Sequence, residues 1–136
     1  MGYRSTIVFG VKKSNSSKLD EILKEYSMTP DEKVSRYYKN YKMIKDKDGR
    51  FLEWERADDV EMTIYKFEYF KWYADYPEVM AITKCLENLY EDGRLTERDD
   101  TTFLVALGEE GEIYSTIGEW HNFVGHVSKL EIHETY

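Results

Sequence analysis

The sequence predicts an α+β fold, with a single mainly antiparallel sheet and two main helices packed on one of its faces. Runs of β-branched and aromatic residues are separated by tight turn signals, which is typical of antiparallel strands. Two segments, residues 17–27 and 77–92, repeat apolar residues at helical spacing. The length of 136 residues allows one full hydrophobic core. We therefore expect one α+β domain that spans residues 1–136.

The first elements are a strand and a helix. Residues 3–12 are β-branched and aromatic and are partly apolar on both faces, which predicts a central strand. Ser17 and Asp20 resemble a capping box, so we expect a helix that runs to about Ser27. Its apolar stripe at helical spacing consists of Leu19, Ile22, Leu23 and Tyr26.

Residues 28–56 allow two interpretations. Residues 29–32 (Thr-Pro-Asp-Glu) resemble a helix start, and the aromatic residues that follow fit helical spacing as well as strand alternation. Asp48-Gly49 lies between two apolar runs and predicts a hairpin, because Gly accepts the positive φ of such a turn. We expect a short helix, then a hairpin, then a polar break at residues 57–59.

A long aromatic strand and an amphipathic helix follow. From Val60 to Tyr73 the apolar residues fall on both parities, so either both faces are covered or a bulge shifts the phase near Lys66. Pro77 fits the first turn of a helix, with Asp75 as its cap. We expect this helix to end at Asp92-Gly93.

The last third predicts strands joined by tight turns. Residues 101–107 are typical of a buried strand, residues 108–111 of a turn, and residues 112–117 of the partner strand. An apolar knot of Trp120, Phe123 and Val124 follows, and residues 127–132 suggest a final strand. We expect the sheet face opposite the helices to be partly open and covered by tyrosines.

The net charge of −8 is unevenly distributed. Residues 1–50 hold 12 basic against 7 acidic side chains, whereas residues 51–136 hold 7 against 20. Opposite potentials steer association, so the acidic part favours a partner with a basic surface and disfavours direct nucleic-acid binding. With neither a signal peptide nor a run of roughly 20 apolar residues, we expect no membrane contact and a cytoplasmic location.

Short motifs are spread along the chain at residues 1–5 (MGYRS), 71–79 (KWYADYPEV), 103–109 and 127–132 (VSKLEI). In this order they resemble a family of small uncharacterised proteins of bacteriophages and prophages, over most of the chain except residues 28–56. The resemblance implies a phage or mobile-element accessory protein that acts in the cytoplasm of a bacterial host, and it implies no chemistry.

The histidines and the cysteine, which could ligate a metal or act in catalysis, occur in patterns that favour a protein without enzymatic activity. His121, His126 and His133 lack His-Glu-x-x-His spacing, so surface histidines are expected. Cys85 has no histidine within its own element and is expected to be a buried structural thiol. We predict no catalytic residue, no metal site and no cofactor, and keep a small metal-dependent hydrolase as a third hypothesis.

Three clusters are candidate binding surfaces. An aromatic corner resembles an interface hot spot, a basic and aromatic segment could hold phosphates and stack bases, and an acidic turn could meet a basic partner. The candidate residues are Tyr73, Asp75 and Tyr76 of the corner, Tyr38, Lys42 and Arg50 of the basic segment, and Glu109 and Glu110 of the turn.

Ahead of the hydrolase, these observations favour two functional hypotheses. The first is an accessory protein that binds and modulates, by inhibition, a host protein such as a component of antiviral defence, without catalysis. The alternative is a small-ligand protein that binds or sequesters a nucleotide. The oligomeric state stays open, a homodimer included, as does the possibility that the carboxylates form one face that imitates a phosphate backbone.

Overall fold

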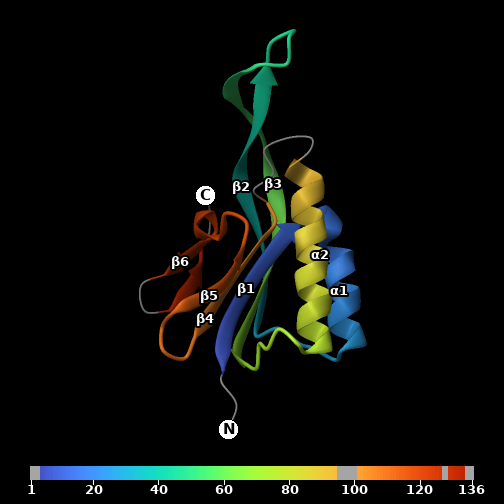
Figure 1. Cartoon of the computed structure of the whole chain (residues 1–136), viewed down its shortest axis with the longest axis vertical. Helices are drawn as coiled ribbons and strands as arrows, with labels where there is room; N and C mark the ends of the chain where they lie inside the picture. Colours follow the sequence, from blue (N-terminus) through green and yellow to red (C-terminus); the bar gives the residue numbers. More distant parts are fainter. Residues whose placement is uncertain (1–3, 95–100, 127–128, 134–136) are drawn as a thin grey trace.

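A five-stranded antiparallel sheet forms the centre of the molecule, with strand order β2-β3-β1-β4-β5. The computed structural model describes residues 4–94, 101–126 and 129–133. The strands are β1 (Ser5–Lys12), β2 (Glu32–Lys45), β3 (Phe51–Phe70), β4 (Phe103–Gly108) and β5 (Ile113–Ile117). Helices α1 (Ser16–Glu25) and α2 (Pro77–Arg94) lie together on one face (Figure 1). The predicted α+β architecture is confirmed.

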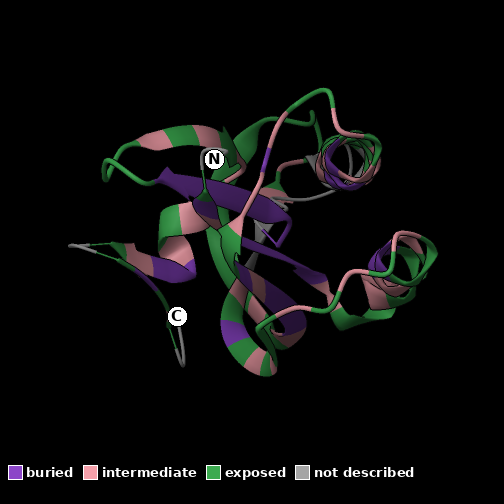
Figure 2. Cartoon of the chain, turned by 90° about the horizontal axis from the view of Figure 1, so that it is seen from below, coloured by how far each residue is buried: buried purple, intermediate pink, exposed green. Residues whose placement is uncertain are grey.

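The opposite face of the sheet is covered by the C-terminal segment rather than by tyrosines. This segment holds the short helix η2 (Trp120–Asn122) and a small sheet of β6 (Val124–His126) and β7 (Leu130–Ile132). Figure 2 shows it across the sheet from the two helices. Lys66 Nζ donates to the Leu130 carbonyl at 3.1 Å and ties it to β3. The expected open face was therefore wrong, and Val127 lies outside the described residues.

Two hydrophobic cores form, one on each face, because β1 and β3 send alternate side chains to opposite sides. On the helix side Phe9 stacks on Tyr65 and Phe67, with ring centroids 5.1 and 5.9 Å apart. On the other side Phe103 stacks on Phe123 at 4.7 Å. Burying each such ring contributes about 1.5–3 kcal/mol. Odd- and even-numbered residues of β3 are both apolar because each face of the sheet is covered by a hydrophobic core.

A bulge also interrupts β3, slightly beyond the predicted place near Lys66. The register with β1 shifts between Ser5 and Ile7, opposite Phe70 and Phe67. Tyr69, within this interval, has φ +53, which lets the strand turn toward the corner that precedes α2.

The expected helix after Thr29 was wrong, because residues 32–45 form β2. Asp31 N donates to the Lys66 carbonyl at 2.8 Å, and Asp31 Oδ2 accepts a hydrogen bond of 2.6 Å from Glu68 N. These bonds attach the segment to β3 before a helical turn can form. Residues 57–59 do not break the chain either, since β3 passes through them.

The two helices follow the prediction with small shifts. The α1 helix is closed by a bond from Met28 N to the Leu23 carbonyl (2.8 Å), with the intervening Ser27 at φ +53, which is a left-handed helix end. In α2 the first helical bond runs from Met80 N to the Tyr76 carbonyl, so the cap position belongs to Tyr76 and not to Asp75. The helix extends to Arg94, past the expected end at Asp92-Gly93.

Candidate functional site

The outer half of the β2–β3 hairpin, residues 40–57, extends beyond both cores, and we call it the arm. Its register runs from Asn40 opposite Ala57 to Lys45 opposite Phe51. The two strands rise above the rest of the molecule in Figure 1. Among the arm side chains that the structure describes, none is buried. The arm is therefore held mainly by its own strand pairing.

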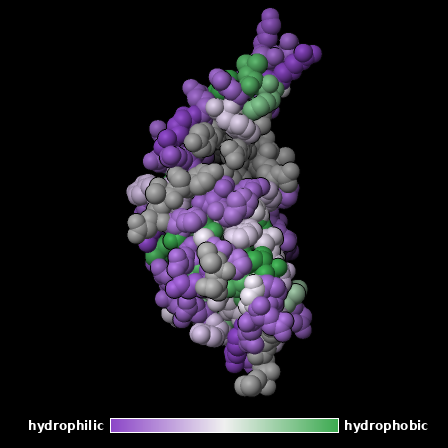
Figure 3. Space-filling model, turned by 90° about the vertical axis from the view of Figure 1, so that its left-hand side faces the viewer, coloured by the Kyte–Doolittle hydropathy of each residue, from purple (hydrophilic) through white to green (hydrophobic). Residues whose placement is uncertain are grey.

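Apolar side chains are exposed near the tip of the arm. Phe51 is 52% exposed, Leu52 58% and Trp54 39%. The register skips Leu52, because Ile44 pairs with Glu53 and Lys45 pairs with Phe51. This bulge brings Phe51 and Trp54 to the same face, where their ring centroids are 5.3 Å apart. Figure 3 shows hydrophobic side chains gathered in this part of the arm.

The arm is nearly neutral, so the predicted basic surface is diluted by carboxylates. Residues 40–57 include five basic and four acidic residues. Lys42 pairs in register with Glu55, although the Lys42 side chain lies outside the described residues. Arg50 is exposed in the turn, where its N–H donates to Asp46 Oδ1 at 2.9 Å. This arrangement weakens the case for phosphate binding along the arm.

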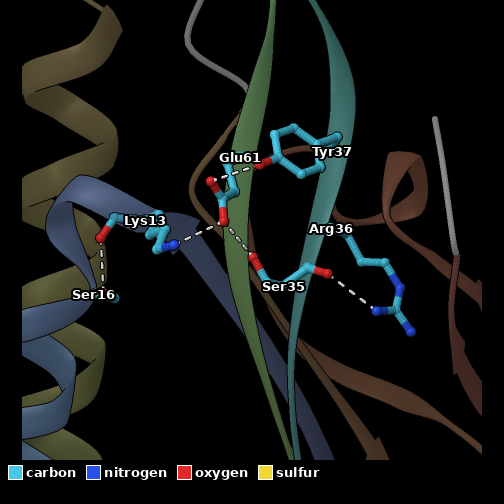
Figure 4. Close-up of polar contacts among 6 residues, drawn as sticks. All are labelled: Lys13, Ser16, Ser35, Arg36, Tyr37 and Glu61. Carbon is cyan, nitrogen blue, oxygen red and sulfur yellow. Dashed lines mark hydrogen bonds and ion pairs between the residues drawn. The ribbon is translucent and has the colours of Figure 1, made fainter.

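A polar cluster around Glu61 joins three elements at the base of the arm (Figure 4). Glu61 Oε1 accepts hydrogen bonds from Lys13 Nζ (3.0 Å) and Ser35 Oγ (2.8 Å), and Oε2 accepts one from the Tyr37 hydroxyl (3.0 Å). The bonds from Lys13, Ser35 and Tyr37 hold the pKa of the Glu61 carboxyl below its usual range. All three donors stabilise the ionised form, so the cluster connects the base of the arm to Lys13, the residue that directly follows β1.

Tyr38 is a core residue, which corrects its assignment as a binding residue. Its side chain is fully buried, its ring packs edge-on against Phe123 with centroids 4.9 Å apart, and its hydroxyl donates to the His133 carbonyl at 2.7 Å. Burial raises the pKa of Tyr38 to about 12. The side chain is therefore unavailable to a ligand at the surface.

The predicted aromatic corner lies at the end of the molecule away from the tip of the arm. Tyr73 and Tyr76 are half-buried and meet edge to face with centroids 5.1 Å apart, and Asp75 is exposed. Trp72 is buried in the helix-side core, as expected. Its carbonyl accepts a hydrogen bond of 3.4 Å from the Tyr114 hydroxyl, which links the corner to β5.

The predicted acidic turn connects β4 and β5. Glu109 and Glu110 are both exposed, and Glu109 Oε1 accepts a hydrogen bond from Arg4 N. Figure 1 places this turn at the lower end of the molecule and the arm at the upper end. The corner and the turn therefore share one end, both next to Tyr114 on β5, whereas Arg50 and Lys42 belong to the arm. The predicted residues do not form one site.

The cysteine and the histidines are the side chains that nucleophilic catalysis or metal binding would use. Cys85 is half-buried, and burial raises the pKa of its thiol, which disfavours the reactive thiolate. Over residues 4–94, 101–126 and 129–133, no three His, Cys, Asp or Glu side chains converge to hold a metal ion. His121 and His126 are exposed. In the same part of the chain, no helix is both long and apolar enough to span a membrane.

No protein-family model, no curated protein and no solved structure matches this chain.

The apolar face of the arm is the feature that the sequence-based prediction missed. The predicted hairpin places Phe51, Leu52 and Trp54 in its second apolar run but assigns them to no surface. The available signal was three apolar residues within four positions, a spacing that cannot alternate cleanly between two faces of a strand. Only the register shows which of the three share a face.

Proposed function

We propose that this protein is an accessory factor, of phage or mobile-element origin, that binds a host protein through the arm and inhibits it without catalysis. The observation that carries the proposal is the exposed pair Phe51 and Trp54 on one face of the arm. The phage origin, the cytoplasmic setting and a target in antiviral defence are supported by the sequence resemblance alone.

The aromatic pair has the chemistry of an interface anchor. Aromatic residues dominate binding hot spots, because they bury large areas and lose little rotamer entropy. An exposed apolar cluster that the protein's own core does not cover often marks a protein contact. Phe51 and Trp54 lie at the far end of a projecting hairpin, where they can enter a cleft that the body of the protein is too wide to enter.

The base of the arm supplies rigidity. A two-stranded ribbon is marginally stable in water, so an unsupported arm would sample many orientations. The Glu61 cluster links the base of the arm to Lys13, just after β1, and the inner half of the same hairpin contributes side chains to both cores. Holding the aromatic pair in place before binding lowers the entropy lost on association.

The proposal is tested by affinity capture from bacterial lysate with a double variant, Phe51→Ser with Trp54→Ser. Both side chains are exposed, so the variant should fold, which circular dichroism checks. Tyr69→Asn is the matched control, because Tyr69 is 81% exposed, lies outside the arm and has a positive φ that Asn accepts.

We expect the wild-type protein and Tyr69→Asn to retain the same stoichiometric partner and the double variant to lose it. Retention of that partner by the double variant would show that the arm is not the docking element. Recovery of no partner, together with turnover of a nucleotide or a peptide, would overturn the proposal.

Nucleotide sequestration is less well supported by the geometry. Tyr38, its proposed stacking residue, lies in the core. A shallow pocket of about 270 Å³ has lysine and hydroxyl groups in its lining, but Lys13 pairs with Glu61 and Lys33 pairs with Asp20. These carboxylates oppose phosphate. Thermal-shift measurements with nucleotides separate the hypotheses, because a ligand that binds only the folded state raises the melting temperature.

A further inference from the structure

A groove of about 680 Å³ lies between α2 and β5, at the opposite end of the sheet order from the arm. Its volume is within the range of about 300–1,000 Å³ that is usual for ligand sites. Met80 and Tyr114 are 57% and 42% exposed, and the buried Trp72 and Val79 add apolar surface. The groove residues that matter here are Trp72, Val79, Met80, Thr83, Lys84 and Tyr114.

The groove lies along a sheet edge. β5 pairs with β4 and is the last strand in the sheet order, so within the described residues no strand pairs with its other side. Tyr114 and Thr116 are exposed along it. An edge strand presents backbone N–H and C=O groups that a further strand can pair with. A segment added there would send alternate side chains toward Met80 and Tyr114.

The charged residues around the free edge of β5 indicate which kind of peptide segment could bind there. Glu109, Glu110 and Glu112 lie at one end of β5, and Glu119 follows its other end. Glu87 lines the groove from α2, where Lys84 is the basic residue of the lining. Carboxylates at both ends and along one wall match lysine and arginine side chains, which strengthens association at low salt.

We propose that the groove between α2 and β5 binds an extended basic segment of a partner protein, which adds to β5 as a strand and places alternate apolar side chains against Met80 and Tyr114. This surface is separate from the arm, so it goes beyond the function proposed above. It gives the predicted basic partner a specific recognition mode, in which backbone pairing supplies affinity and the acidic rim supplies selectivity.

The test uses a pool of short synthetic peptides in which Lys or Arg alternates with randomised apolar residues, and a second pool with Glu in place of the basic residues. Wild-type protein should enrich members of the basic pool alone. For an enriched peptide, Met80→Lys places a like charge in the groove and should weaken binding by about tenfold or more. Tyr69→Lys is the matched control, being the same new charge at an exposed residue that does not line the groove.

Strand addition has its own signature. N-methylation removes backbone N–H donors from the enriched peptide. Methylating one alternate set of residues should abolish binding, whereas methylating the other set should not, because only one set faces β5. Amides of β5 should also gain hydrogen-exchange protection when the peptide binds. Failure to enrich the basic pool, equal binding by Met80→Lys, or a peptide that becomes helical when bound would each overturn the proposal. Because Phe51 and Trp54 are intact in these variants, failure here leaves the arm hypothesis to its own test.

Discussion

The two halves of the β2–β3 hairpin share one pair of strands and differ in what surrounds them. In the inner half, Val34 pairs with Ile64 and Tyr38 with Val60, and these side chains pack in the core beneath the C-terminal segment. In the arm, Phe51 and Trp54 are also large and apolar, but they are exposed. The difference shows that apolar content alone does not place a residue in the core. The inner half is structural because other elements cover it, and the arm is left for recognition.

The largest expected effect is a difference in stability between two variants, each of which truncates one aromatic residue, in the inner half and in the arm. Tyr38→Ala removes a fully buried ring and its bond to His133, so it should lower the free energy of unfolding by about 3–5 kcal/mol. Trp54→Ala truncates a partly exposed ring that packs on Phe51 and should lower this free energy by about 1 kcal/mol or less. Urea denaturation of both variants measures the contrast. Similar losses from both would mean that the arm contributes to the core.

A second prediction concerns alkaline pH. Because folding raises the pKa of Tyr38 to about 12, the neutral phenol stabilises the fold. This contribution is fully present below the pKa of free tyrosine, about 10, and is lost as the pH rises toward 12. Burial also raises the pKa of Tyr65, which adds to the loss. Denaturation midpoints across this range should fall less steeply in Tyr38→Phe than in the wild type. An unchanged slope would contradict a role for Tyr38.

The smallest expected effect concerns the Glu61 cluster, which lies where the inner half of the hairpin meets the arm. Glu61→Gln removes the charge that Lys13 pairs with, so arm amides should lose hydrogen-exchange protection while core amides keep theirs. Since the pKa of Glu61 is lowered, its contribution is present at neutral pH and is lost as the pH falls through the lowered value. The difference between variant and wild type should therefore vanish in acid.

Glu53→Gln is the control for Glu61→Gln, because Glu53 lies within the arm and pairs in register with Ile44. It should leave protection at the base of the arm unchanged. Equal loss of protection in Glu53→Gln and Glu61→Gln would show that the arm responds to its total charge and not to the cluster at its base.

The predicted binding residues divide along similar lines. Tyr73, Asp75, Glu109 and Glu110 were predicted from residue type, and the structure places them at one end of the molecule, Tyr73 half-buried and the three carboxylates exposed. Tyr38 was chosen by the same reasoning and is buried, because its parity on β2 directs it under the C-terminal segment. Met80 carried a usable signal, since it lies outside the helical spacing of the apolar residues Val79, Ile82 and Leu86. Tyr114 carried none, because its place in the groove depends on the neighbouring helix.

The sequence by itself determined the local elements: the central strand β1, both helices, the Asp48-Gly49 hairpin and the β4–β5 turn, because apolar period and turn chemistry act over a few residues. Tertiary structure alone decided that residues 32–45 are a strand, that the C-terminal segment covers the second face, and where the hairpin leaves the core to become the arm. Each of these depends on pairing between residues far apart in the chain, such as Asp31 with Glu68 or Lys66 with Leu130. Local propensity carries no information about such pairing.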